Sequence, residues 1–203
     1  MKINYPKEKE YEKESLINIE EDISYKKFNE EIDYFSKKID FKYCLFEKVK
    51  IEEGLFDFSS FDNVIFKECD FSNISFRECD FNRIKFIDCK LVGTIFIDSY
   101  FKDVSIENCD LRYSNFNHTK MDKIEIMKTN MENSYLSGVD LKNISFHQNN
   151  FNSSDFTNTK LKDIDFSTSK IENMKVNYPF YEGVIVDIEG AIEISKSLGI
   201  KII

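Results

Sequence analysis

The chain has 203 residues, of which 41% are hydrophobic and 32% are charged, with only 6 Gly and 2 Pro. This composition excludes collagen-like, low-complexity and wholly disordered chains, and its length allows a sizeable buried core. The formal net charge is −9, from 28 basic and 37 acidic residues. Direct binding of DNA or RNA is not expected, because phosphate backbones require clustered basic residues and the arginines are only Arg77, Arg83 and Arg112.

The N-terminal segment, residues 1–38, has the pattern of an extension that ends in a helical cap. Ser24 is a candidate N-cap, and an amphipathic helix is expected after it, lying over the start of the next domain. The first fifteen residues are rich in Lys and Glu, and the sequence leaves open whether they are ordered. The apolar residues with helical spacing are Tyr25, Phe28, Ile32, Phe35 and Ile39.

The cellular location is expected to be cytoplasmic. The first residues contain no apolar run of the length that a signal peptide needs, and no later stretch approaches a membrane span. The cysteines are five, an odd number, and none lies in a CxxC pattern, so neither a disulfide framework nor a zinc site is indicated. We expect reduced, structural cysteines and no membrane partner.

From residue 41 to residue 176, a large apolar residue occupies every fifth position, 28 times in succession. The position two residues earlier is usually small or β-branched, as at Val64, Cys69 and Ile74. A helix would spread a five-residue repeat around all its faces, and a flat strand would alternate it between two faces, so neither element fits. The pattern predicts a chain that turns a corner every five residues, with both selected positions pointing inward.

This unit resembles that of the pentapeptide-repeat family, in which a small residue, a polar residue, a central Leu or Phe and two polar residues follow one another. Residues 69–73, 79–83 and 109–113 fit this consensus almost completely. The resemblance implies an all-β solenoid over residues 39–178, a right-handed quadrilateral β-helix of about seven coils with four pentapeptides per coil. Short helical caps are expected at the N- and C-termini.

Four pentapeptides per coil place each central side chain on its equivalent twenty residues further on. Phe can recur in such a ladder because aromatic rings pack well in offset stacks. The phenylalanines expected in the core ladders are Phe41, Phe61, Phe66, Phe71, Phe76, Phe81, Phe86, Phe96, Phe101 and Phe116.

The C-terminal segment, residues 179–203, is expected to form a helix and a dimerisation tail. Asp187 is a candidate cap for a helix over residues 188–198, and Gly199 is a candidate stop. A helix followed by an apolar end resembles the C-terminal dimerisation module of Qnr-type and MfpA-type pentapeptide-repeat proteins. The alternative is a cap folded onto its own chain. The residues expected at the dimer contact are Ile192, Leu198, Ile200, Ile202 and Ile203.

The expected outer surface carries acidic residues in stacked rows. These rows either imitate the phosphates of DNA or form the charged, solvated face that any solenoid needs. An apolar belt around one coil, represented by Ile87 and Ile97, is a second candidate contact with a partner. The acidic candidates are Glu68 and Asp88 on one ladder, Glu78 and Asp98 on the opposite ladder, and Asp80 on a third.

The sequence contains none of the common catalytic or nucleotide-binding motifs, and we expect no enzymatic activity, no cofactor and no metal. His118 and His147 fall at outward positions and are expected to be solvated. Asn149 falls in an inward slot, where its side chain should find hydrogen-bond partners, because an unpaired buried amide is costly.

Three functions remain open. Resemblance to the Qnr-type and MfpA-type proteins implies a DNA-mimicking homodimer that binds a type II topoisomerase, DNA gyrase, and inhibits it or protects it from quinolones. The second is a protein-interaction scaffold or accessory protein with a partner other than a topoisomerase. The third is a self-associating structural element whose functional surface is the C-terminal tail.

Overall fold

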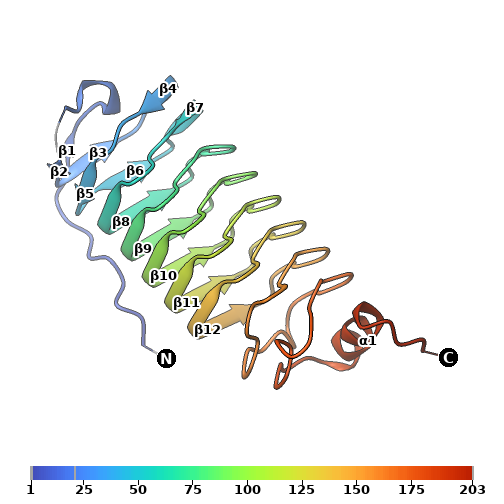
Figure 1. The fold of residues 1–203 in the computed structure, drawn as a ribbon. Helices are drawn as coiled ribbons and strands as arrows, with labels where there is room; N and C mark the ends of the chain where they lie inside the picture. Colours follow the sequence, from blue (N-terminus) through green and yellow to red (C-terminus); the bar gives the residue numbers. More distant parts are fainter. Residues whose placement is uncertain (1, 21, 203) are drawn as a thin grey trace.

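The computed structural model describes residues 2–20 and 22–202, so the expected dimer residue Ile203 lies outside the described residues. Within this part, the chain forms a parallel β-solenoid of about 6 turns with one short C-terminal helix. Figure 1 shows the strands stacked side by side along one axis in the order of the sequence. The fold class implied by the resemblance to the pentapeptide-repeat family is confirmed, and the number of turns is close to the seven expected.

All strand pairs are parallel. From β8 onward, each strand pairs with the strand one coil away, so that Phe61 lies beside Phe81 and Phe81 beside Phe101. β4 and β7 pair in a second sheet, and isolated bridges such as Lys90 to Asp110 join the remaining sides of the coils. The elements are β1 (Glu12–Lys13), a 3-10 helix (Leu16–Asn18), β2 (Ile23–Ser24), β3 (Lys26–Phe28), β4 (Glu31–Ser36), β5 (Asp40–Lys42), β6 (Leu45–Glu47), β7 (Lys50–Leu55), β8 (Ser60–Lys67), β9 (Asp80–Ile87), β10 (Tyr100–Glu107), β11 (Lys120–Met127), β12 (Asp140–His147) and α1 (Ile188–Ser197).

The core is a set of stacked apolar ladders inside the coils. Phe56 and Phe76 stack with ring centroids 4.9 Å apart and ring planes 1° from parallel. Neighbouring ladders meet edge to face, as Phe71 and Phe76 do at 5.9 Å and 65°. Both arrangements are favourable for aromatic rings. The ladder phenylalanines are at most 1% exposed: Phe41, Phe61, Phe66, Phe71, Phe76, Phe81, Phe86, Phe96, Phe101 and Phe116.

Most sides of the coil end at a residue with left-handed backbone, two positions after the central apolar residue. The φ angle is 62° at Asn73, 54° at Asp88 and 67° at Gly93. Gly, Asn and Asp adopt this conformation at the lowest cost, which explains why they recur at this position of the repeat. These corner residues point away from the core and form the edges of the solenoid.

The inward slot before each central residue also accepts polar side chains, and several of them are hydrogen-bonded to the backbone of a neighbouring coil. Asn149 Nδ2 donates to Ile126 O at 2.8 Å, and its Oδ1 accepts from Thr129 N at 3.0 Å. Ser99 Oγ likewise donates to Phe76 O at 2.7 Å. The hydrogen bonding predicted for Asn149 is therefore confirmed.

The helix expected after Ser24, over residues 25–39, is wrong, because this segment forms strands β3 and β4. Phe28 pairs with Phe46 and Ile32 with Ile51, so the segment is a shortened first coil. Its step to the next coil is 18 residues at Phe28 and 19 at Ile32, instead of 20. A helix here would leave the backbone groups at the first edge of the sheet unpaired, whereas strands satisfy them.

Residues 2–9 form an N-terminal arm that returns along the outside of the solenoid (Figure 1). Asn4 N donates to Asp103 Oδ1 at 3.1 Å, and the Tyr5 hydroxyl donates to Glu125 Oε2 at 2.8 Å. Backbone pairing of the N-terminal segment starts only at Glu12, whose N–H donates to Tyr25 O. The first fifteen residues, whose order the sequence left open, thus include both a short strand and a docked arm.

The stack opens on two of its four sides after β12. Between residues 140–148 and 160–168, all described by the structure, no backbone–backbone hydrogen bond forms. On the other two sides the bonds continue, from Phe151 N to Lys170 O at 2.8 Å and from Phe156 N to Lys175 O at 2.9 Å. Leu141, a central residue of β12, is consequently only half-buried. β12 is thus an open edge of the main sheet.

The C-terminal end continues the solenoid for part of a coil before the helix. Leu161 N donates to Phe180 O at 2.8 Å, so residues 180–185 pair with the preceding coil. Asp187 caps α1 by accepting from Gly190 N at 2.8 Å, and Gly199 follows the helix with φ of 80°. The helix predicted over residues 188–198 and its two end signals are confirmed.

Candidate functional site

The acidic candidates stand at corners of the coils, on two opposite edges of the solenoid. Each side of a coil takes five residues, so corner rows that are ten residues apart in sequence lie half a coil apart. All four carboxylates at these corners are exposed. We name the rows the Glu68 edge, with Lys48, Glu68, Asp88, Asn108 and Lys128, and the Glu78 edge, with Phe58, Glu78, Asp98 and His118.

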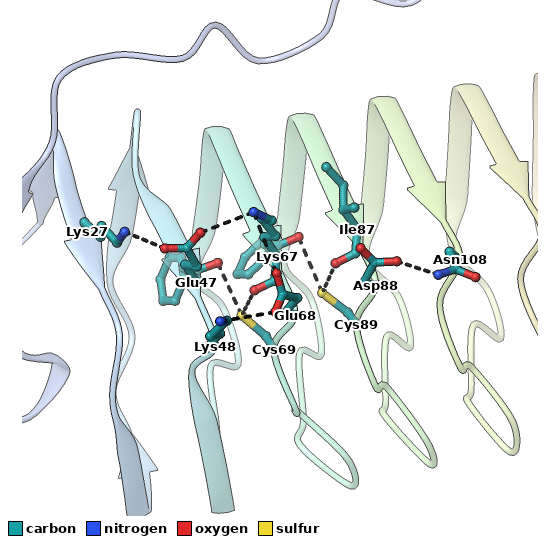
Figure 2. A network of polar contacts seen from close by, with 12 residues as sticks. Lys27, Glu47, Lys48, Lys67, Glu68, Cys69, Ile87, Asp88, Cys89 and Asn108 are labelled. Carbon is teal, nitrogen blue, oxygen red and sulfur yellow. Dashed lines mark hydrogen bonds and ion pairs between the residues drawn. The ribbon is translucent and has the colours of Figure 1, made fainter.

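On the Glu68 edge, the carboxylates are largely paired (Figure 2). The Glu68 carboxylate lies 3.6 Å from Lys48 Nζ and 3.7 Å from Lys67 Nζ. Asn108 Nδ2 donates to the Asp88 carboxylate. Figure 2 shows these groups as a band of alternating acids and donors along the coils. Such a band has little net field, because each negative charge has a donor or a positive charge beside it.

On the Glu78 edge, the carboxylates are free. Within the described residues, neither Glu78 nor Asp98 takes part in an ion pair or a side-chain hydrogen bond. Phe58 precedes them in the same row and is 53% exposed. This edge therefore presents two uncompensated negative charges one coil apart, beside an exposed aromatic ring.

The other candidates do not join these acids into one patch. Asp80 begins β9 in a different ladder, between Ser60 and Tyr100. Ile87 adjoins the Glu68 edge and Ile97 adjoins the Glu78 edge, so the two isoleucines lie on opposite edges. Both side chains are half-buried. A single flat partner cannot contact both parts of the apolar belt.

One side of the solenoid, next to the Glu78 edge, is almost free of charge. Its central row, which we name the uncharged row, carries no ionised side chain over five coils. Tyr135 is 46% exposed and Leu55 is 36% exposed. Sequence analysis did not single out this row, although taking every twentieth residue from position 55 would have found it. The uncharged row is Leu55, Ser75, Ile95, Asn115 and Tyr135.

The C-terminal helix packs on the last coil through one face and exposes the other. Gly190 and Ile194 are buried, while Ile188, on the outer face, is 83% exposed. Among the residues expected at a dimer contact, Ile192 and Leu198 are half-buried. Ile200 is 55% and Ile202 is 52% exposed. An apolar surface larger than a cap requires is thus open at this end.

A metal-binding cluster and a reactive thiol are two further kinds of candidate site. The described residues contain no cluster of three or more His, Cys, Asp or Glu side chains that fits a metal ion. All five cysteines are free and buried, and burial raises the pKa of Cys44 to about 11 and of Cys79 to about 12. Such thiols stay protonated at neutral pH and are poor nucleophiles.

A membrane-spanning helix is also absent from the described residues, since none of their helices has the length and apolar character that this requires.

Solved structures of several pentapeptide repeat proteins are similar to this chain, and QnrB1, HetL and Rfr23 are three of these proteins. A trypsin-treated variant of QnrB1, a plasmid-mediated fluoroquinolone resistance protein, is 20% identical, with a TM-score of 0.40 over 91% of this chain and 100% of that chain. HetL, a pentapeptide repeat protein involved in heterocyst differentiation regulation from the cyanobacterium Nostoc sp. strain PCC 7120, is 11% identical, with a TM-score of 0.48 over 84% and 88%. Rfr23 from the cyanobacterium Cyanothece 51142 is 8% identical, with a TM-score of 0.24 over 73% and 91%.

No curated protein matches the chain. The family model of the pentapeptide repeat region, in contrast, matches residues 59–136 and 100–178. Together these two matches cover more than half of the chain, over the coils whose ladders and corners have been described above. The protein therefore belongs to the pentapeptide-repeat family.

Proposed function

We propose that the protein is a non-enzymatic binding protein, a homodimer that occupies the DNA-binding surface of a type II topoisomerase, DNA gyrase, as a mimic of duplex DNA. The observation that carries the proposal is the Glu78 edge. Glu78 and Asp98 are exposed, unpaired and one coil apart on a rod. Regularly spaced negative charges of this kind attract a basic groove and steer association with it.

The dimensions of a dimer agree with this function. At about 4.8 Å per coil, six coils extend over about 30 Å, and two solenoids joined at their C-terminal ends extend over about 60 Å. Duplex DNA rises about 3.4 Å per base pair, so the dimer has the length of about 18 base pairs. The exposed isoleucines of α1 and the tail, Ile188, Ile200 and Ile202, supply an apolar surface for such a junction.

The test is a gyrase supercoiling assay with purified protein, titrated to tens of micromolar, with and without a quinolone. We expect inhibition of supercoiling, or protection from the drug, at low micromolar protein. The double variant Glu78→Lys with Asp98→Lys should lose this effect by at least tenfold, because it places positive charges against a basic groove.

A matched control reverses two negative charges at surface positions outside the Glu78 edge. Asp33 and Glu53 are exposed and lie on the sheet of β4 and β7, outside the row of corners that forms the Glu78 edge. The double variant Asp33→Lys with Glu53→Lys should retain the effect on gyrase. If the folded protein has no effect on gyrase at any concentration, or if both double variants lose the effect equally, the proposal fails.

The uncharged row favours a second candidate function, a scaffold for a partner other than a topoisomerase. Flat, uncharged β surfaces with exposed aromatic side chains are suited to protein contacts. On this alternative, Ile97→Asp and Tyr135→Asp would abolish binding of the partner, while the charge reversals on the Glu78 edge would leave it unchanged. The gyrase assay separates the two functions, because only the first predicts inhibition or protection.

A further inference from the structure

The N-terminal arm, residues 2–9, lies across the outside of strands β8 to β11 (Figure 1). At one end, Lys9 Nζ lies 5.9 Å from the ring centroid of Tyr43. At the other end, Asn4 and Tyr5 reach Asp103 in β10 and Glu125 in β11. The arm therefore runs back over the coils that follow it in sequence.

The contacts of the arm are specific. Asp103 accepts from the backbone N–H of Asn4 at 3.1 Å and from its side-chain Nδ2 at 3.3 Å. Glu125 accepts from the Tyr5 hydroxyl at 2.8 Å, and Lys85 Nζ lies 4.5 Å from the centroid of the Tyr5 ring. Asp103 accepts from two donors, and the Tyr5 ring lies between a carboxylate and an ammonium group. These contacts favour a segment that offers a double donor followed by an aromatic hydroxyl.

The arm buries groups that other coils leave open. Asp103 is 3% exposed and Ser105, on the same strand, is 7% exposed. Asn143, which lies in the same row as Asp103 but beyond the arm, is exposed. Pro6 is also buried in this contact. The surface under the arm therefore carries a buried carboxylate, while Asn4 and Tyr5 themselves stay exposed.

Side chains rather than a backbone ladder hold the arm in place. Within the described chain, residues 2–9 make no backbone–backbone hydrogen bond with the strands beneath them. Each coil of the solenoid, in contrast, is tied to the next by backbone bonds on several sides. An extended segment that is fixed by a few side-chain contacts at the end of a chain is far easier to release than a coil.

From this arrangement we propose that the surface under residues 2–9 is a peptide-binding site, and that the arm is its built-in competitor. The occupant from outside is an extended segment of a partner protein with the chemistry of the arm, a side-chain amide or another double donor followed by an aromatic hydroxyl and a proline. Asp103 receives the donors, Glu125 the hydroxyl and Lys85 the ring. This inference is independent of the gyrase proposal.

The experiment compares the full chain with a variant that lacks residues 2–9. The probe is a synthetic peptide with the sequence of residues 2–9, labelled at its C-terminus and followed by fluorescence anisotropy. We expect the peptide to bind the shortened chain at least tenfold more tightly than the full chain, because the tethered arm competes at a millimolar effective concentration. The thermal unfolding midpoint of each protein establishes that it is folded.

Two changes test the contacts themselves. Asp103→Asn in the shortened chain should weaken peptide binding at least fivefold, whereas Asp98→Asn, on the Glu78 edge, should leave it unchanged. A peptide that carries Tyr5→Ala should bind at least fivefold more weakly than the parent peptide. A full chain with Asn4→Ala and Tyr5→Ala, which keeps its length, should bind the parent peptide nearly as well as the shortened chain.

Three results would overturn the proposal. The first is no binding of the peptide to the folded, shortened chain at 1 mM peptide, a ceiling on the order of the effective concentration of a short tether. The second is equal binding to the full and shortened chains. The third is a full chain that is dimeric in light scattering and becomes monomeric when residues 2–9 are removed, because this surface would then hold the arm of a second copy.

Discussion

Phe81 stacks on Phe61 one coil away, with ring centroids 5.0 Å apart and ring planes 5° from parallel. Phe81 also stacks on Phe101 on its other side, at 4.6 Å and 13°. Phe81 therefore has an aromatic neighbour on both sides in its ladder and is fully buried. Removal of the Phe81 ring takes a stacking partner from both Phe61 and Phe101. The centre of the solenoid is therefore sensitive to truncation of a single side chain.

Truncation of this ring should be severe. Phe81→Ala removes a fully buried side chain and leaves a cavity between two stacked rings, and we expect a loss of about 3 to 5 kcal/mol in the free energy of unfolding. Phe58→Ala, at a position that is 53% exposed, should cost less than about 1 kcal/mol. Urea denaturation followed by circular dichroism measures both, and equal losses would contradict the assignment of the core.

The cysteines should be protected from reagents until the chain unfolds. Burial raises the pKa of Cys79 to about 12, so its thiol stays protonated in the folded protein. We expect all five thiols to react with a thiol reagent at pH 8 at least a hundredfold more slowly in the native protein than in denaturant. Rapid reaction of any cysteine in the native state would contradict its burial.

The raised pKa of Cys79 predicts the direction in which the stability of the folded protein changes with pH. In the unfolded chain the Cys79 thiol loses its proton near pH 9, whereas in the folded chain burial lets it keep the proton to higher pH. The unfolded state therefore binds fewer protons above pH 9, and stability should fall as the pH rises through this range. Cys79→Ala should reduce the slope of the unfolding midpoint between pH 8.5 and 10, and an unchanged slope would exclude Cys79 as a cause.

The open edge after β12 should be visible in amide hydrogen exchange. The strands β11 and β12 are paired with each other, while β12 has no backbone bonds to residues 160–168 within the described chain. We expect the amides of Leu141, Asn143 and Phe146 to exchange at least tenfold faster than those of Met121 and Ile126. Equal protection along both strands would mean that the stack is closed in solution.

The outer face of α1 should determine the oligomeric state. Ile188→Asp with Ile192→Asp places two charges on the apolar surface at the C-terminal end, and we expect light scattering to report a change from dimer to monomer. Ile17→Asp, at an exposed position near the other end, should leave the mass unchanged. A monomeric parent protein would remove the dimer from the proposed function.

The solenoid was predictable because its five-residue period can be read directly from the types of residue along the sequence. Every fifth residue is apolar, and the twenty-residue ladder follows from the resemblance to the family. The first coil was not recognised, since its steps of 18 residues at Phe28 and 19 at Ile32 break the frame and happen to give helical spacing. Ile23 and Phe28, five residues apart, were the remaining signal of the repeat.

The surfaces were less predictable than the core. The sequence places Glu68 and Glu78 on opposite ladders, but it does not say that Lys48 and Lys67 pair with Glu68 while Glu78 stays free. The path of the N-terminal arm was also hidden, because it depends on contacts such as that of Asn4 with Asp103, about a hundred residues away in sequence. Side-chain contacts between residues far apart in sequence produce no periodic pattern in the sequence.

The opening after β12 leaves one corner of the last coil without backbone bonds to the coil before it. A coil that is bonded on four sides is fixed at every side, but one that is bonded on two adjacent sides is free to lift at the opposite corner. Residues 160–168 would then move away from β12 while residues 170–175 stay bonded to residues 149–156. Because residues 160–168 pair with residues 180–185, which lead into α1, the angle between the two rods of a dimer joined through α1 would adjust to the curvature of the surface that receives them.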